Sequence, residues 1–184
     1  MTNNSKQVLG IIGSPRKKGN TDILVKTILE SASEANAKVD AVYLNELKIN
    51  PCQACNYCAK NGSCRQDDDM KSIIDKMKKS DIWIFGTPVY WWGPTAQFKL
   101  FIDRWFDLYH NYRFNNKKVL LVIPSGGGTS YAKYTEAMLK DALVYMGATV
   151  FGTLFAPNTS GRGEVKNDLK LMGEAKRLGK EILK

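Results

Sequence analysis

Five short apolar runs divide the chain, and each has the length of a buried β-strand. The runs are rich in Val, Ile, Leu and Phe, a pattern typical of strands that are covered on both faces. The first run stops at Gly13-Ser14-Pro15, where a loop is expected. The predicted strands are residues 7–12, 39–47, 82–86, 118–124 and 148–156.

The segments between and after these runs are predicted to be helices, because their apolar residues recur every three or four positions. The acidic triplet Asp67-Asp68-Asp69 stands at the start of one of them, where carboxylates suit the positive end of the helix dipole. The predicted helices are residues 21–35, 68–79, 95–110, 130–146 and 164–183.

Two of these helices carry a recognisable stripe of residues. The residues that share one face of the helix at 130–146 are Tyr134, Ala137, Met138, Asp141, Ala142 and Tyr145. The residues that form one stripe of the helix at 164–183 are Val165, Leu169, Met172, Ala175 and Ile182.

Strands that alternate with helices predict a parallel sheet with helices on both faces, a three-layer α/β fold. The chain has 184 residues, which suits one domain, and no repeat or linker divides it. Its composition, 43% hydrophobic and 24% charged, excludes disordered, collagen-like and disulfide-scaffold classes. No apolar run reaches the ~18 residues of a membrane span, and no signal peptide is expected from the short apolar stretch near the N-terminus. We therefore expect a cytoplasmic protein without a membrane partner.

The chain is basic, with 27 Lys and Arg against 18 Asp and Glu, a net charge of +9. The excess is spread along predicted helix faces, which is typical of solvated surfaces. A nucleic-acid partner is therefore not expected, and a zinc-stabilised nucleic-acid module is the weakest hypothesis. The charge remains compatible with an anionic cofactor.

The loop between the first strand and the first helix has the chemistry of a phosphate site. A helix N-terminus offers unpaired N–H groups and a favourable dipole to an anion. Ser14, Asn20 and Thr21 add side-chain donors, and Arg16 adds a charge-assisted contact. Gly19 allows tight backbone geometry. The alternative is an ordinary strand-to-helix turn capped by Ser and Asn.

Missing motifs narrow the choice of phosphate ligand. Gly19 is followed by Asn20 and Thr21, which is not the GK[ST] of a nucleoside-triphosphate loop. Gly10 and Gly13 do not have the GxGxxG spacing of a dinucleotide site. The phosphate ligand that these motifs leave open is a terminal monophosphate that binds without a metal ion.

Three consecutive aromatic residues, Tyr90, Trp91 and Trp92, follow the third strand between two prolines. A short loop cannot direct all three into one core, so some of them must cover a flat ligand or a partner surface. In a sheet of order 2-1-3-4-5, this loop and the phosphate loop would flank one crevice. A phosphate site beside a flat apolar surface fits flavin mononucleotide (FMN). The alternative for the aromatic loop is a hydrophobic subunit interface.

Three segments together resemble a known family: GSPRKKGNT (13–21), CQACNYCAKNGSC followed by DDDM (52–70), and TPVYWWGPTAQFKLFIDR (87–104). The sequence resembles the NAD(P)H-dependent FMN reductases of the flavodoxin-like superfamily, in particular the branch of the iron–sulfur flavoproteins. The resemblance implies a single FMN-binding domain over residues 1–184, with a cysteine-rich loop at about 50–66. It also implies a homodimer or homotetramer.

The resemblance also implies which residues bind the cofactor, whereas no residue is expected to act as a catalytic acid or base. Lys99, Asp103 and Arg104 match the family's K-x-x-x-D-R pattern and are expected to be scaffold or dimer contacts. The expected FMN-binding residues are Ser14, Arg16, Gly19, Asn20, Thr21, Thr87, Pro88, Val89, Tyr90, Trp91, Ser125, Gly126 and Gly127.

Cys52, Cys55, Cys58 and Cys64 form a C-x2-C-x2-C-x5-C motif after the second strand. Four thiolates this close together can surround one tetrahedral zinc ion or an iron–sulfur cluster. The spacing resembles the cluster motif of the iron–sulfur flavoproteins. A [4Fe–4S] cluster, a structural zinc ion and uncoordinated thiols all stay open.

The expected function is that of an FMN-dependent oxidoreductase. It would take hydride from NAD(P)H and pass electrons to a quinone, a flavin or another small acceptor, through an iron–sulfur cluster if one is bound. The alternative is a flavodoxin-type electron carrier that does not oxidise NAD(P)H directly. His110 is the only histidine, so hydrolysis by a Cys–His pair has little support.

Overall fold

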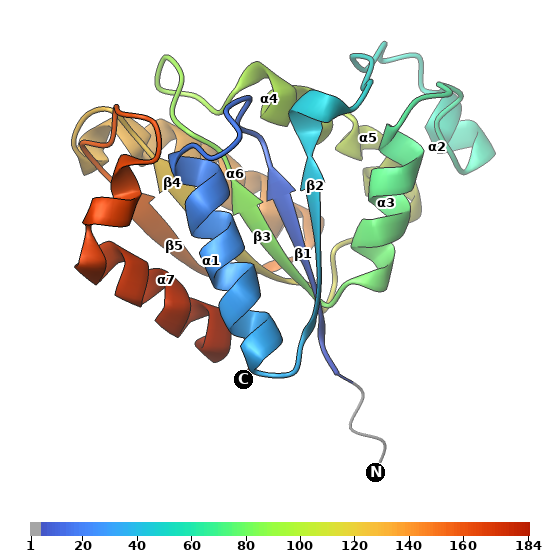
Figure 1. Ribbon diagram of the computed structural model, residues 1–184. Helices are drawn as coiled ribbons and strands as arrows, with labels where there is room; N and C mark the ends of the chain where they lie inside the picture. Colours follow the sequence, from blue (N-terminus) through green and yellow to red (C-terminus); the bar gives the residue numbers. More distant parts are fainter. Residues whose placement is uncertain (1–4) are drawn as a thin grey trace.

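The computed structural model describes residues 5–184, which contain one sheet of five parallel strands in the order β2-β1-β3-β4-β5 (Figure 1). This confirms the predicted fold and strand order. Residues 1–4, which belong to the N-terminal stretch where no signal peptide is expected, lie outside the described residues. The strands are β1 (Gln7–Ile12), β2 (Lys38–Tyr43), β3 (Ile82–Gly86), β4 (Lys118–Pro124) and β5 (Thr149–Ala156).

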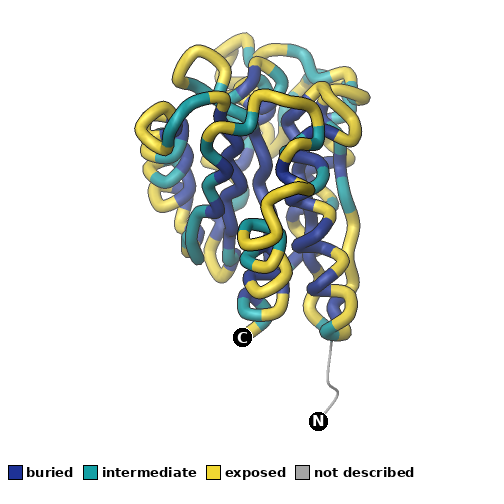
Figure 2. The backbone as a smooth tube through the Cα atoms, turned by 60° about the vertical axis from the view of Figure 1, so that its left-hand side comes forward, coloured by how far each residue is buried: buried dark blue, intermediate teal, exposed yellow. Residues whose placement is uncertain are grey.

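Helices cover both faces of the sheet, and each face has its own apolar core (Figure 1). One core contains Ile28 of α1 and Leu178 of α7, while Met70 of α3, Phe98 of α4 and Leu139 of α6 belong to the other. Figure 2 shows the buried strands enclosed by helices whose outer sides are exposed. The helices are α1 (Asn20–Glu34), α2 (Tyr57–Asn61), α3 (Met70–Lys79), α4 (Ala96–Asp103), α5 (Trp105–Asn111), α6 (Lys133–Met146) and α7 (Leu169–Glu181).

Several predicted boundaries were wrong. The second strand stops at Tyr43, and a short 3-10 turn, η1 (Leu44–Glu46), follows it. The helix predicted at 95–110 is interrupted at Arg104, where ψ is −4° and the side chain turns inward. Two further 3-10 turns, η2 (Thr129–Ala132) and η3 (Glu164–Asn167), precede α6 and α7.

Only some residues of the two predicted stripes are buried. In α6 the side that packs inward carries Leu139 and Leu143, while Tyr134 and Tyr145 lie on the exposed side. Helix α6 therefore has apolar residues on two sides, and the tyrosines, whose hydroxyls favour water, occupy the outer one. In the last stripe, Leu169 is 83% exposed because it opens α7 at the outer edge of the helix.

None of the helices within residues 5–184 is both long and apolar enough to cross a membrane.

Candidate functional site

A crevice of about 230 Å³ lies at the carboxyl edge of the sheet, between the loops that follow β1, β3, β4 and β5. Because β1 and β3 are neighbours, the phosphate loop and the loop after β3 flank it, as expected from the strand order. The predicted residues that line it are Ser14, Arg16, Gly19, Asn20, Thr21, Pro88, Val89, Tyr90, Ser125 and Gly126. The lining residues that were not predicted are Pro124, Thr159, Ser160, Gly161 and Arg162.

The phosphate loop presents the N-terminus of α1 to the crevice. Gly19 is the N-cap residue and no side chain caps the helix, so the N–H groups of its first turn remain available to a ligand. A Cβ atom on Gly19 would lie 2.8 Å from the carbonyl oxygen of Arg16, so the turn requires glycine. The Ser14 hydroxyl accepts a hydrogen bond from the Arg16 N–H at 3.2 Å.

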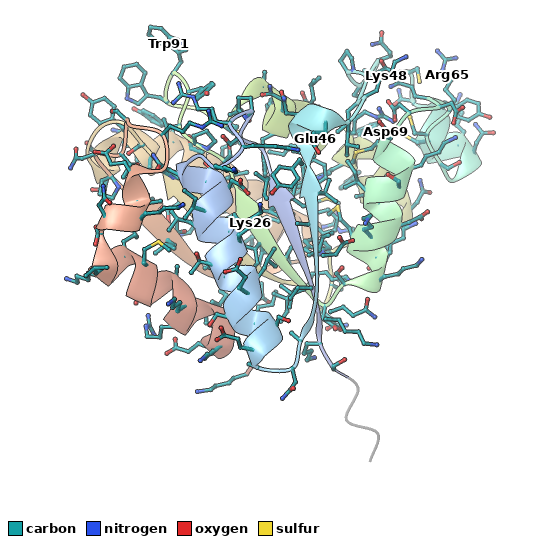
Figure 3. The ribbon with its side chains drawn as sticks, viewed as in Figure 1. Lys26, Glu46, Lys48, Arg65, Asp69 and Trp91 are labelled. Carbon is teal, nitrogen blue, oxygen red and sulfur yellow. The ribbon has the colours of Figure 1, made fainter. Side chains whose placement is uncertain are left out.

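Asp22 supports this loop from behind. Its buried carboxylate accepts hydrogen bonds from the Lys18 N–H at 2.6 Å and the Tyr43 hydroxyl at 2.8 Å. Burial and the neighbouring Asp22 raise the pKa of Tyr43, so the hydroxyl stays protonated and donates a hydrogen bond to Asp22. Lys26, labelled on α1 in Figure 3, lies 3.4 Å from the Asp22 carboxylate oxygen that also accepts the Tyr43 hydrogen bond.

Asn20 lines the crevice, but its side chain serves another loop. Its amide nitrogen donates to the carbonyl oxygens of Thr159 at 3.0 Å and Gly161 at 2.9 Å. Its amide oxygen accepts from the Val165 N–H at 3.3 Å. Asn20 therefore ties the loop after β5 to the phosphate loop, and the prediction of a free phosphate donor does not match this arrangement.

The loop after β5 brings a second guanidinium to the crevice. Arg162 donates two hydrogen bonds to the Lys17 carbonyl oxygen, at 3.1 and 2.6 Å, and so lies across the phosphate loop from Arg16. The sequence contained a signal for this loop, since the polar run Thr159-Ser160-Gly161-Arg162 begins three residues after the end of β5, whose carboxyl end faces the crevice.

The loop after β3 ends in a tight turn that lifts Trp91 away from the crevice. Tyr90 and Gly93 exchange two backbone hydrogen bonds, at 2.8 and 3.0 Å, around Trp91 and Trp92. Both Trp residues have positive φ, 50° and 61°. Trp91 is 92% exposed, so it does not line the crevice as predicted, and Figure 3 shows it projecting from the molecule. The Val89 N–H is already bonded to the Pro124 carbonyl oxygen at 2.9 Å.

Thr87 and Gly127 support the crevice without lining it. Thr87 is buried, and its hydroxyl accepts a hydrogen bond from the Thr95 N–H at 3.1 Å at the start of α4. Gly127 faces the ring of Tyr131, which a Cβ atom would approach to 2.6 Å. Its carbonyl oxygen accepts from the Ser125 hydroxyl at 2.8 Å, which orients the wall formed by Ser125.

The four cysteines lie in the segment between β2 and α3, at the same edge of the sheet as the crevice. Cys58 is buried, Cys55 is exposed, and Cys52 and Cys64 are intermediate. Across residues 5–184, no three Cys, His, Asp or Glu side chains are gathered closely enough to hold a metal ion.

The donor chemistry nevertheless fits an iron–sulfur cluster, because four free thiols lie within one short segment. Burial is the main cause that raises the pKa of Cys58, and the nearby Asp107 and Cys64 add to it. Arg104 places a guanidinium N–H 3.5 Å from the Cys64 sulfur. A cation at this sulfur suits a thiolate ligand.

Comparison with known proteins identifies relatives along most of the chain. Residues 7–160 match the family described as NADPH-dependent FMN reductase. An iron–sulfur flavoprotein of Methanocaldococcus jannaschii is 32% identical over 183 residues, covering 96% of this chain and 95% of the relative. An iron–sulfur flavoprotein of Methanosarcina thermophila is 32% identical over 147 residues, covering 79% of this chain and 77% of the relative.

A solved structure shares the fold. An NAD(P)H:quinone oxidoreductase from Methanothermobacter marburgensis has a TM-score of 0.77 and covers 97% of both chains at 17% identity. This likeness concerns the fold alone, whereas the match over residues 7–160 and the similarity to the Methanocaldococcus protein concern the family. The protein therefore belongs to the NADPH-dependent FMN reductase family and is a flavin-dependent oxidoreductase.

Proposed function

We propose that FMN binds in this crevice and that the protein oxidises NAD(P)H and passes the electrons to a small acceptor such as a quinone or a free flavin. The observation that carries the proposal is the convergence of the uncapped α1 N-terminus and Arg16 on one side with Pro88 and Val89 on the other. A phosphate suits the first side and a planar ring suits the second.

The residues of the crevice bind and orient the cofactor rather than transfer protons. When bound, FMN supplies the redox chemistry by accepting hydride at N5 and releasing the electrons to the acceptor. Among the described lining residues the only charged side chains are Arg16 and Arg162. Their positive charge stabilises the phosphate and the negative charge of a reduced flavin. We therefore assign no acid–base residue.

We also propose that Cys52, Cys55, Cys58 and Cys64 hold a [4Fe–4S] cluster. The four free thiols, the guanidinium beside Cys64 and the naming of two relatives as iron–sulfur flavoproteins support this assignment. The relatives' names describe those proteins and not this one. The direct test for this protein is anaerobic purification followed by iron, sulfide and zinc analysis.

Residues 1–184 are proposed to work as one FMN-binding domain that assembles into a homodimer or homotetramer in the cytoplasm. Free thiols and the use of NAD(P)H suit a reducing compartment. Five exposed aromatic residues, which we call the aromatic face, support assembly because such surfaces are commonly buried by a partner. The aromatic face comprises Trp92, Tyr109, Tyr131, Tyr134 and Tyr145.

The substitution Arg16→Gln tests the binding mode. Loss of a charge-assisted hydrogen bond costs about 1.5–3 kcal/mol, so FMN affinity should fall roughly 10- to 100-fold. Riboflavin, which lacks the phosphate, should bind almost as it does to the unmodified protein. Flavin fluorescence quenching measures both affinities, and Arg177→Gln on the remote helix α7 is the matched control.

Equal loss of FMN and riboflavin affinity in the Arg16 variant would place the phosphate elsewhere. Protein that remains colourless when FMN is added would defeat the proposal as a whole. Bleaching of the bound flavin by NADPH or NADH alone distinguishes a reductase from an electron carrier, which needs a partner protein to become reduced.

A further inference from the structure

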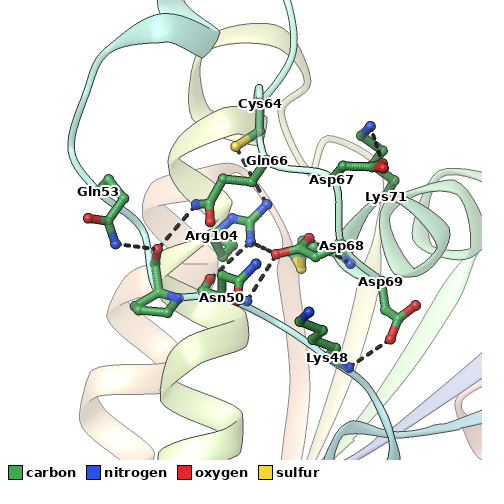
Figure 4. Close-up of polar contacts among 12 residues, drawn as sticks. Lys48, Asn50, Gln53, Cys64, Gln66, Asp67, Asp68, Asp69, Lys71 and Arg104 are labelled. Atoms are coloured by element: carbon green, nitrogen blue, oxygen red, sulfur yellow. Dashed lines mark hydrogen bonds and ion pairs between the residues drawn. The ribbon is translucent and has the colours of Figure 1, made fainter.

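Arg104 is a buried cation at the base of the cysteine segment. Its side chain is 2% exposed, and its partner Asp68 is fully buried. Besides the ion pair with Asp68, the guanidinium donates to the Asn50 carbonyl oxygen at 3.0 Å and to the Cys64 sulfur at 3.5 Å (Figure 4). One side chain therefore contacts three separate points of the segment.

These contacts close the segment at both ends. The chain leaves the sheet region near Asn50 and returns at Asp68, and the Asp68 carboxylate also accepts the Asn50 N–H at 2.9 Å. Outside this centre, Asp69 accepts the Lys48 N–H at 2.7 Å, as Figure 4 shows. The acidic triplet stands at the start of α3 as expected, where Asp68 accepts the Met70 N–H at 3.2 Å, and Asp68 and Asp69 in addition hold the chain near Asn50 and Lys48.

The pair stays charged although it is buried. Burial favours the neutral carboxyl, but the bonds from Arg104 and from backbone N–H groups lower the pKa of Asp68 below 3.8. Burial likewise opposes the charge on Arg104, but Asp68 more than compensates and raises the pKa of Arg104. An arginine guanidinium stays protonated in proteins, so the contact at 3.5 Å holds a permanent cation against Cys64.

The third acceptor of the Arg104 guanidinium is a sulfur atom, that of Cys64. A neutral thiol is a weak acceptor, whereas a metal-bound thiolate carries negative charge and accepts strongly. We propose that Arg104 is the positioning residue of the cysteine segment, residues 50–66, and this proposal rests on the cluster proposed above. It holds Cys64 as a ligand and donates a charge-assisted N–H···S bond that raises the reduction potential of the cluster.

The direction of this effect follows from charge. Reduction adds an electron to the cluster, and a nearby cation stabilises the more negative state. Hydrogen bonds from outside the ligand shell fix the orientation of ligands and tune the metal centre. Removal of the guanidinium should therefore shift the midpoint potential to a more negative value.

The test uses the double variant R104M/D68N. Replacing both charges avoids an unpaired buried ion, and the single Asn amide oxygen can keep one of the two backbone bonds, to Asn50 or to Met70, which the two Asp68 oxygens accept separately. The matched control is K99Q/D103N, which removes an ion pair that is half-exposed and lies on the same helix. Folding of each variant is checked by circular dichroism.

Two measurements on the full chain decide the inference. In metal-free protein, tryptic cleavage at Lys48, Lys60 and Arg65 should be several-fold faster in R104M/D68N than in the unmodified protein and the control. After anaerobic reconstitution, a potentiometric titration monitored by electron paramagnetic resonance should give a more negative midpoint only in R104M/D68N. An unchanged midpoint or unchanged cleavage overturns the role of Arg104.

Failure of the cluster proposal has a different signature. Unmodified protein that takes up no iron and sulfide contradicts the cluster and with it the tuning of its potential. The cleavage comparison then still decides whether Arg104 holds the segment, because it uses metal-free protein.

Discussion

The carboxylate of Asp68 is held by three donors: the Arg104 guanidinium and the backbone N–H groups of Asn50 and Met70. These donors outweigh the desolvation that burial imposes, so the pKa in the folded protein lies below that in the unfolded chain. The stability that Asp68 contributes is therefore complete above the unfolded pKa and is lost as the pH falls through the folded pKa.

Asp68→Asn should make stability less dependent on acid. At pH 7 the variant should lose about 3 kcal/mol of unfolding free energy, because Arg104 is left unpaired in a buried site. Between pH 5 and pH 3 its stability should decline less than that of the unmodified protein. Urea unfolding at both pH values measures this, with Asp103→Asn as an exposed control that should cost under about 1 kcal/mol.

Asn20→Ala should weaken FMN binding although the Asn20 side chain, predicted to be a phosphate donor, is bonded to the loop after β5. The variant loses three hydrogen bonds to the loop after β5, each contributing about 1 kcal/mol. The loop that carries Arg162 should become mobile, and FMN affinity should fall about tenfold. Asn61→Ala, which removes one exposed hydrogen bond, is the control for the fluorescence titration. FMN affinity equal to that of the unmodified protein would contradict this role.

The lining by Ser14, Arg16 and Gly19 could be predicted because they follow a strand whose position in the sheet the pattern indicates. The duty of Asn20 could not be predicted, because its partners lie about 140 residues away and only the folded loop brings them close. Arg104 was expected to be a scaffold or dimer contact, but its pairing with Asp68 could not be predicted, because the two residues are 36 positions apart and leave no local pattern.

At the scale of elements, the turn after β3 combines exposure with backbone strain. Trp91 and Trp92 both occupy the left-handed region, where a side chain costs roughly 1–2 kcal/mol per residue. Two central residues with positive φ are typical of a type I′ turn, which normally uses Asn and Gly. Such strain persists only where the surroundings fix it, and Trp92 is fixed by stacking on Tyr131 at 5.7 Å.

Trp91→Gly should be more stable than Trp91→Ala by about 1 kcal/mol. Both substitutions remove the exposed ring, but only glycine relieves the positive φ of 50°. Thermal or urea unfolding of the two variants gives the difference directly. Equal stability, or a more stable alanine variant, would show that the turn does not hold this conformation in solution.

The strands were predicted closely because buried parallel strands are short, apolar and ended by loops; β3 and β4 match to the residue. The prediction of one long helix at 95–110 was wrong at Arg104. This residue is a good helix former, but its side chain points inward there and forms a buried ion pair with Asp68. Helix α2 within the cysteine segment lacked any amphipathic signal, since it has only five residues.

For the whole molecule, the aromatic face is the clearest unexplained surface. Tyr109 and Tyr145 stack at 5.6 Å across α5 and α6, while Trp92 and Tyr131 stack near the crevice. The surface therefore extends from the crevice along two helices on one side of the sheet. Burial against a second copy of the chain would remove these rings from water.

The double substitution Tyr134→Glu and Tyr145→Glu should dissociate the assembly. Two carboxylates in an apolar interface oppose burial, so the variant should sediment near the 20.6 kDa of a single chain. Leu169→Glu, on α7 at the other face of the sheet, is the control and should leave the mass unchanged. Monomeric unmodified protein at micromolar concentration would refute the proposed assembly.

Helix α4 contacts both the loop after β1 and the cysteine segment. At its start the Thr95 hydroxyl donates to the Gly13 carbonyl oxygen at 2.7 Å, and the Phe98 ring lies only 2.5 Å from where a Cβ atom of Gly13 would be. Directly after the last residue of α4, Arg104 donates a hydrogen bond to the Cys64 sulfur in the cysteine segment. The crevice and the cysteine segment thus share one helix about 12 Å long as a support. Because the same helix contacts both regions, a displacement of α4 would disturb the phosphate loop and the cysteine segment together.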